Sequence, residues 1–118
     1  MPRERKKDKR IRQIYRWLAF SYPTPYPTQL KLVRGKKRRS DQGWCFLRRR
    51  VLVIHVDHKY PLYSCIDTLI HEYAHAMAWS HASLDAYEFD HNDAWGLAYA
   101  KAYRNFNDEG GDRESWEF

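Results

Sequence analysis

The segment His71-Glu72-Tyr73-Ala74-His75 constrains the fold of this chain more than any other five residues. Histidines four residues apart face the same way on an α-helix, where side chains at i and i+4 are neighbours. At that spacing two imidazoles can bind one metal ion, and Glu72 can reach a water molecule beside it. The pattern is typical of zinc hydrolases, with the glutamate as general base, so we expect a helix here and Zn²⁺ as cofactor.

The residues around the motif support a helix. Apolar side chains recur at helical spacing, and they are Ile66, Leu69, Ile70, Tyr73, Ala74 and Met77. This stripe predicts a helix over about residues 63–79. Placing two histidines and a glutamate on an otherwise apolar helix face costs free energy, so we interpret these three residues as functional rather than structural.

A catalytic zinc site needs a third protein ligand and one open position. His81 would extend the motif to H-E-x-x-H-x-x-A-x-x-H, but Ala78 stands where the metzincin pattern has a glycine, and no methionine follows for that pattern's Met-turn. Glu88 lacks the second-helix setting that usually supplies a glutamate ligand. His91 lies where a loop meets a second predicted helix, so it is favoured, with His81 as the alternative.

Periodic patterns outside the motif predict an α+β fold, and the resemblance of His71–His75 to the zincin motif implies a small zincin-like domain. We expect an N-terminal helix, a sheet of about three strands, the helix with the motif and a second core helix. The predicted ranges are a helix over 4–21, strands over 30–34, 44–49 and 51–57, and a helix from about 93 to 106 with Trp95, Leu97, Ala98, Ala102 and Phe106 in the core. Short connections favour antiparallel neighbours in the sheet.

The predicted metallopeptidase domain spans residues 1–106, with 1–10 as a basic, partly flexible start and 107–118 as an acidic tail. Cys45 and Cys65 form neither a disulfide framework nor a metal knuckle, so we expect two buried reduced thiols. No stretch approaches the roughly 18 apolar residues of a membrane span, and no secretory signal is visible. These features predict no membrane partner and a cytoplasmic protein, or a virion-associated one if a phage encodes it.

Charge is unevenly distributed along the chain. Residues 1–50 carry a net charge of +14 and residues 51–118 a net charge of −8. A basic half of this kind suits contact with a polyanion such as DNA, and the four consecutive residues Lys36, Lys37, Arg38 and Arg39 are the candidate contacts. A solvated face that keeps an aromatic-rich protein soluble is the alternative.

Several other polar residues lie near the predicted site. Tyr99 and Tyr103 could donate to a developing oxyanion, although tyrosines at such positions are more often core residues. Asp67 and Asp93 are candidates to orient the ligands, with surface or capping roles as alternatives. His55 and His58 are interpreted as ordinary strand-end residues.

The segments from Ile66 to Ala76 and from His91 to Trp95 resemble the active-site helix and third-ligand segment of SprT-like zinc metallopeptidases. The resemblance covers roughly residues 10–106 and implies that His91 is the third ligand. It also implies substrates that are bound or crosslinked to DNA. The chain departs from the family pattern at Asn92, where a glycine is usual, and in lacking a cysteine-rich zinc ribbon after the domain.

The leading hypothesis is a zinc metalloendopeptidase with His71, His75 and His91 as ligands and Glu72 as catalytic base. Its partners would be a protein or peptide substrate, DNA and a larger assembly. One alternative is a non-catalytic structural protein of a phage or mobile-element assembly that retains a zinc site. Another is a basic nucleic-acid-binding module.

Overall fold

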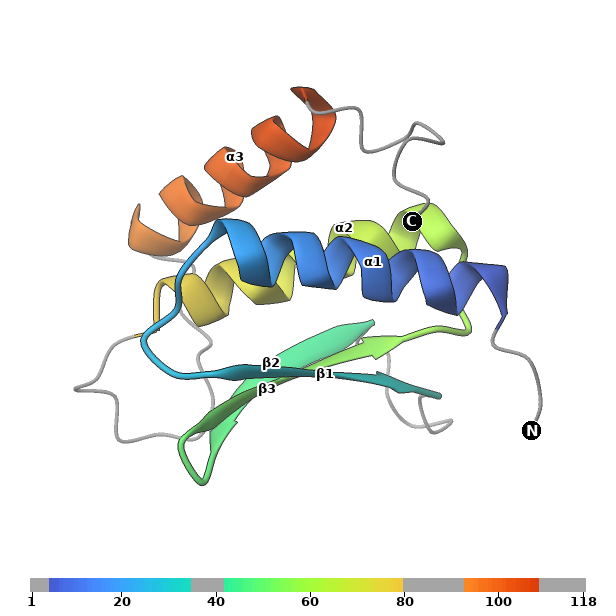
Figure 1. Cartoon of the computed structure of the whole chain (residues 1–118), viewed down its shortest axis with the longest axis horizontal. Helices are drawn as coiled ribbons and strands as arrows, with labels where there is room; N and C mark the ends of the chain where they lie inside the picture. The colour runs from blue at the N-terminus through green and yellow to red at the C-terminus, as the bar shows by residue number, and fades with distance from the viewer. Residues whose placement is uncertain (1–4, 35–41, 80–92, 109–118) are drawn as a thin grey trace.

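The computed structural model describes residues 5–34, 42–79 and 93–108. Along the chain its elements are α1 (Lys6–Ser21), β1 (Thr28–Val33), β2 (Gly43–Arg48), β3 (Val51–Asp57), α2 (Leu62–Met77) and α3 (Asp93–Asp108) (Figure 1). The predicted α+β class is confirmed, and all six elements lie within about two residues of their predicted bounds.

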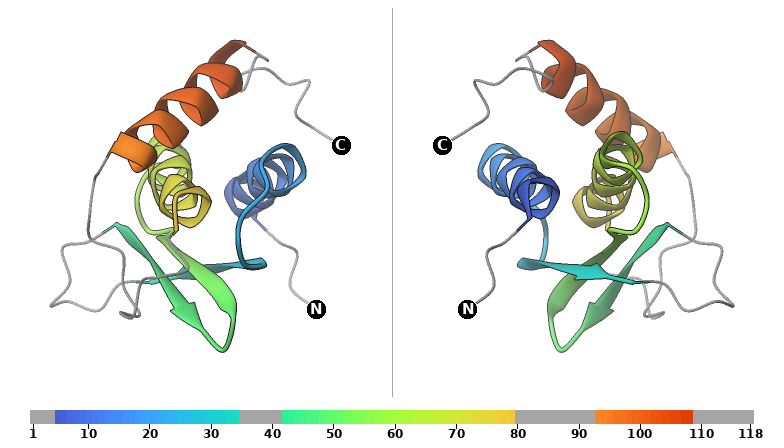
Figure 2. Two further views of the ribbon diagram at one scale, coloured as in Figure 1. Left: turned by 90° about the vertical axis from the view of Figure 1, so that its left-hand side faces the viewer. Right: turned by 90° about the vertical axis from the view of Figure 1, so that its right-hand side faces the viewer.

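The elements form three layers. Helices α1 and α2 lie side by side on one face of the sheet, and α3 packs on α2 on the side away from the sheet (Figures 1 and 2). No helix within the described parts of the chain covers the opposite face of the sheet. Among the same residues, no helix combines the length and apolar character needed to cross a membrane.

The sheet is mixed and has the order β1-β3-β2. Strands β2 and β3 pair antiparallel through a two-residue turn, Arg49-Arg50, in which both residues have positive φ, 50° and 65°. The expectation of antiparallel neighbours is wrong for β1, which pairs parallel to β3 in the register Thr28↔Leu52. More than a dozen residues, including all of β2, separate β1 from β3, which is the length that a parallel pair requires.

The core lies between the sheet and the two helices that cover it. Alternation along β3 buries Leu52, Ile54 and Val56 completely on the helix side. The predicted apolar stripe of α1 buries its Ile11, Ile14 and Leu18 against them. Tyr73 of α2 donates a hydrogen bond of 2.8 Å to the carbonyl of Tyr22, which joins the end of α1 to α2. The two free cysteines, Cys45 and Cys65, are also buried, as expected.

Helix α3 meets α2 through a different stripe from the predicted one. Ala102 and Phe106 are buried as expected, but Leu97 is 74% exposed, so its assignment to the core is wrong. The stripe that faces α2 is set by Trp95 and Tyr99, which are one turn apart. Leu97 follows Trp95 by two positions, about 200° around the helix, and therefore points to solvent.

Candidate metal centre

Helix α2 brings His71 and His75 together on one face. Their ring centroids lie 5.2 Å apart with the planes inclined by 70°. The His71 side chain is about one-third exposed, whereas His75 is only 3% exposed. The predicted pairing of the two imidazoles is thus present, with one ring at the surface and the other below it.

Glu72 is buried beside this pair. The residue is 8% exposed, and its Oε2 atom lies 3.8 Å from Nε2 of His71. Strand β2 contributes to the burial, because a Cβ atom at Gly43 would lie 3.6 Å from Cγ of Glu72 and only 2.5 Å from Cγ2 of Thr68. The edge strand and the motif helix are therefore in tight contact beside the carboxylate.

Trp95 of α3 covers both histidines. Its ring centroid lies 5.0 Å from that of His71 and 5.4 Å from that of His75, and the second pair is stacked. The indole Nε1 donates a hydrogen bond of 3.3 Å to the backbone carbonyl of His71. One side chain thus fixes the start of α3 against the two imidazoles.

Tyr99 lies one turn further along α3 and connects the histidines to Asp67. Its ring is 5.7 Å from that of His71, and its hydroxyl donates a hydrogen bond to Oδ1 of Asp67. Burial raises the pKa of Tyr99, and the hydrogen bond to Asp67 and the charge of that carboxylate raise it further. The hydroxyl therefore remains protonated near neutral pH. Tyr103 stacks on Tyr99, with the ring centroids 5.7 Å apart.

The other histidines of the described chain lie elsewhere. His55 of β3 packs against Trp44 at 4.4 Å on the sheet face opposite α2. His58 is hydrogen bonded through Nδ1 to Asp8 at 3.1 Å. Asp93 is exposed at the first residue of α3, where its charge complements the helix dipole.

The third ligand lies outside the described residues for each of the candidates. His81, Glu88 and His91 all fall between residues 80 and 92, and the basic run from Lys36 to Arg39 falls in 35–41. Within residues 5–34, 42–79 and 93–108, no three His, Cys, Asp or Glu side chains form a metal-binding group. The donors that are described, two imidazoles with a carboxylate beside them, suit zinc.

Two contributors to this site are not predicted from the sequence. The apolar pattern places Trp95 in the core, although the spacing of Trp95, Tyr99 and Tyr103 at i, i+4 and i+8 indicates an aromatic stripe. Gly43 reads as part of a polar turn region, and no local signal in the sequence reveals its contact with α2.

Comparisons with known proteins identify no relative. A scan against protein-family models, a search of curated proteins and a search of solved structures each return no match.

Proposed function

We propose that this chain is a zinc-dependent metalloendopeptidase, with His71 and His75 as two of the metal ligands and Glu72 as the general base. The observation that carries the proposal is the pair of imidazoles 5.2 Å apart on α2 with a buried carboxylate next to them. The burial of His75 and Glu72 costs free energy, which favours a functional role for these polar side chains.

His91 is the proposed third ligand, with His81 as the alternative. The geometry of α3 supports His91, because Trp95 contacts both imidazoles and the helix begins at Asp93, two residues before it. His91 precedes Asp93 by another two residues, and two residues span at most about 7 Å. The first turn of α3 therefore lies against His71 and His75, which favours a ligand that is close in sequence to Asp93.

The chemistry divides between the metal and the carboxylate. When bound, zinc supplies a Lewis acid that polarises a peptide carbonyl and lowers the pKa of water. Glu72 accepts the proton of the attacking water and delivers it to the nitrogen of the leaving amine. The Glu72 side chain is buried beside Gly43 of β2, and this burial limits its contact with bulk water.

The edge of the sheet offers a place for an extended substrate. Among residues 5–34, 42–79 and 93–108, strand β2 pairs with β3 alone, and its first residue, Gly43, packs beside Glu72. A peptide that adds to a free edge gains main-chain hydrogen bonds along its length. Such a peptide would pass close to the general base.

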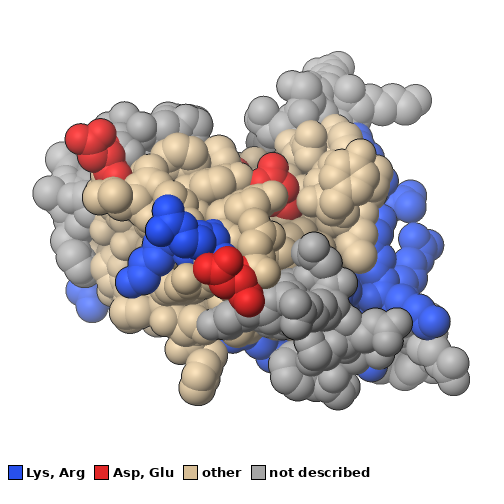
Figure 3. Space-filling model, turned by 90° about the horizontal axis from the view of Figure 1, so that it is seen from above, with Lys and Arg blue, Asp and Glu red and all other residues tan. Residues whose placement is uncertain are grey.

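Proteins associated with DNA are the proposed substrates, on the basis of the family resemblance. The distribution of charge agrees with this choice. Seen from the helix side, lysine and arginine side chains gather mainly toward the end of the molecule at which α1 begins (Figure 3). In that region a polyanion would gain favourable electrostatic contacts.

Zinc content and cleavage test the proposal together. The protein, loaded with zinc, is incubated with casein and with a DNA-bound protein, and Glu72→Gln is the matched variant because it keeps the shape of the side chain. We expect this variant to retain zinc and to lose cleavage by at least about 100-fold, the scale of general-base catalysis. Equal cleavage by the two proteins would exclude Glu72 as the base.

The third ligand is tested by comparing His91→Ala with His81→Ala. Zinc affinity, measured by competition with a chelator, should fall strongly in the first variant and remain near that of the parent in the second. The reverse result would assign the position to His81.

A structural zinc site is the second candidate function. The observation that favours it is the cover over the histidines, since Trp95 stacks on His75, which is 3% exposed. In that case the metal would join α2 to α3 without catalysis. Zinc that stabilises the fold while neither the parent nor Glu72→Gln cleaves any substrate would support this alternative.

A further inference from the structure

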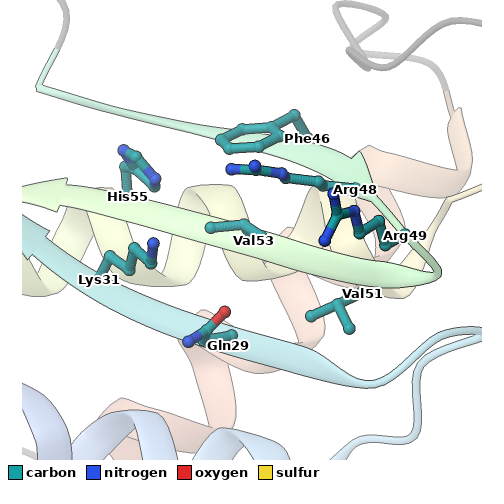
Figure 4. Close-up of a pocket in the computed structure, with 8 residues that line it drawn as sticks. All are labelled: Gln29, Lys31, Phe46, Arg48, Arg49, Val51, Val53 and His55. Carbon is teal, nitrogen blue, oxygen red and sulfur yellow. The ribbon is translucent and has the colours of Figure 1, made fainter.

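We propose that the face of the sheet opposite the helices binds single-stranded nucleic acid. All three strands contribute to a shallow pocket of about 300 Å³ on this face, and Figure 4 shows their side chains standing over it together. The residues that carry the argument are Lys31, Phe46, Arg48, Arg49, Val53 and His55.

Strand register arranges these side chains in rows across the sheet. Lys31, His55 and Trp44 are paired neighbours in one row, and Gln29, Val53 and Phe46 form the next. Trp44 and Phe46 are two residues apart on β2, so they point to the same face about 6.8 Å from each other along the strand. An extended single strand separates its bases by a comparable distance.

The aromatic rings on this face are suited to stacking. His55 packs between Trp44 at 4.4 Å and Phe46 at 5.2 Å, which holds the three rings in place. All three residues remain partly exposed, while Val53 beneath them is 5% exposed. Ring faces over an apolar floor bind unstacked bases in sheet-based single-strand-binding domains.

The charges around the rings are positive. Lys31, Arg48 and Arg49 are exposed at the border of the pocket. The alternation of side chains along β3 places one acid, Asp57, on this face. Asp57 is only 1% exposed, and its Oδ2 atom lies 3.6 Å from Nζ of Lys59. Within the described residues, no exposed carboxylate offsets the three cations, so phosphate groups would be attracted to this border.

The β2–β3 turn adds a second indication that positive charge is useful here. A two-residue turn with positive φ at both positions favours Asn-Gly, but this chain carries Arg49 and Arg50 there. Positive φ at a residue other than glycine costs free energy, and residues in this conformation cluster at functional sites. Arg49 of this turn lines the same pocket as Phe46 and His55.

A single strand fits this face better than a duplex or an acidic peptide does. In a duplex the faces of the bases are stacked on one another and cannot reach Trp44 or Phe46. An acidic peptide would satisfy the cations and leave the rings unused. A single strand uses both, since bases stack while phosphates pair with lysine and arginine.

The inference does not depend on the proposed peptidase activity. Helix α2, with His71 and His75, packs on the other face of the sheet, so the two sites are separate. Glu72→Gln should therefore bind nucleic acid as the parent does.

Fluorescence anisotropy with labelled oligonucleotides tests the proposal. The probes are oligothymidylate and oligouridylate of about 20 nucleotides, longer than the roughly 4–16 that one such sheet covers, together with a duplex of equal length and polyglutamate. We expect both single strands to bind and the duplex and polyglutamate to bind at least tenfold more weakly. Preference for the duplex would overturn the proposal, and so would equal binding of polyglutamate. A difference between the two single strands would identify DNA or RNA as the ligand.

Two variants separate stacking from charge. Phe46→Leu keeps an apolar side chain but removes the ring, and it should weaken binding by roughly 5- to 100-fold while the circular dichroism spectrum stays unchanged. The double variant Lys31→Gln, Arg49→Gln should also weaken binding. It should reduce the slope of log affinity against log salt by about 0.7 for each phosphate that no longer pairs with a cation.

The matched control changes the same number of charges far from the sheet. Lys101 and Arg104 are exposed on α3, the helix most distant from the sheet, and the control replaces both with glutamine. Binding by this control should stay within about twofold of the parent. If the control weakens binding as much as Lys31→Gln, Arg49→Gln, or if Phe46→Leu binds as the parent does, the proposed face is not the binding site.

Discussion

Trp95 of α3 stacks on His75 of α2, with the ring centroids 5.4 Å apart and the planes 29° from parallel. The same indole lies 5.0 Å from the ring of His71. One of the contacts that attach α3 to the rest of the molecule is therefore made to the two candidate ligands themselves. The indole of Trp95 therefore contributes both to the packing of α3 and to the positions of the two imidazoles.

Replacing Trp95 with alanine should lower the free energy of unfolding by about 2–3 kcal/mol, somewhat less than the effect for a fully buried tryptophan. The reason is that the indole packs against both imidazoles and donates the hydrogen bond to the His71 carbonyl. Urea denaturation measures the change. Leu97→Ala is the control on the same helix, because Leu97 is 74% exposed and should change stability by less than about 0.5 kcal/mol. Similar destabilisation in both variants would contradict this account of the helix.

Two glycines should respond in opposite directions to alanine. A Cβ atom at Gly43 would lie 2.5 Å from the carbonyl oxygen of His55, a backbone atom that cannot move without distorting β3. Gly43→Ala should therefore destabilise the protein by about 1–3 kcal/mol. A Cβ atom at Gly96 meets nothing within 4 Å, so Gly96→Ala should stabilise α3 by up to about 1 kcal/mol. Thermal unfolding of the two variants checks the signs, and a stabilising Gly43→Ala would show that β2 is not pressed against α2.

The two thiols should be protected in the folded protein. Cys45 is 4% exposed and Cys65 is 1% exposed, so a thiol reagent such as Ellman's reagent should label neither until urea unfolds the chain. Burial also raises the pKa of Cys65 above the ordinary value of 9.0. The thiol ionises at a lower pH in the unfolded chain than in the folded protein, so the raised pKa of Cys65 stabilises the fold fully below about pH 9. This contribution to stability is lost as the pH rises further. Stability should therefore decline above about pH 9, less steeply in Cys65→Ala. Rapid labelling of the native protein would be the contrary result.

The Arg49-Arg50 turn should lower the stability of the fold while it supplies positive charge at the pocket. Replacing Arg49-Arg50 with Asn-Gly supplies residues that adopt positive φ readily. We expect a gain of about 1–2 kcal/mol in the free energy of unfolding, from the two relieved backbone positions. Arg48→Gln, in the adjacent strand residue, removes a charge without changing the turn and should leave stability nearly unchanged. No gain in the Asn-Gly variant would mean that the turn is unstrained.

Elements governed by local spacing could be predicted from the sequence. His71 and His75 are paired because side chains four residues apart lie on the same face of a helix. The apolar stripes of α1 and α2 follow the same rule. The β-branched run from Val51 to Asp57 matches β3 at both ends.

Features that depend on contacts between distant segments could not be predicted from the sequence. The parallel pairing of β1 with β3 is decided by which strand occupies the centre of the sheet, and neither strand carries that information alone. The contact of Gly43 with Thr68 joins residues that are far apart in sequence. The exposure of Leu97 follows from the face that Trp95 turns toward α2, and hydrophobicity alone does not distinguish the two residues. The assignment of His91 as third ligand stays a prediction.

The position of β3 at the centre of the sheet suggests an order of folding. Its partner β2 is one two-residue turn away, whereas Thr28 of β1 must find Leu52 across a much longer loop. Hairpins form within about 1–10 μs, and long loops close with a larger loss of entropy. Helix α2 follows β3 directly, so the hairpin and the histidine helix can assemble before the N-terminal segment joins them. Pulsed hydrogen exchange should then protect amides of β2 and β3 earlier than those of β1, and simultaneous protection of all three strands would rule out this order.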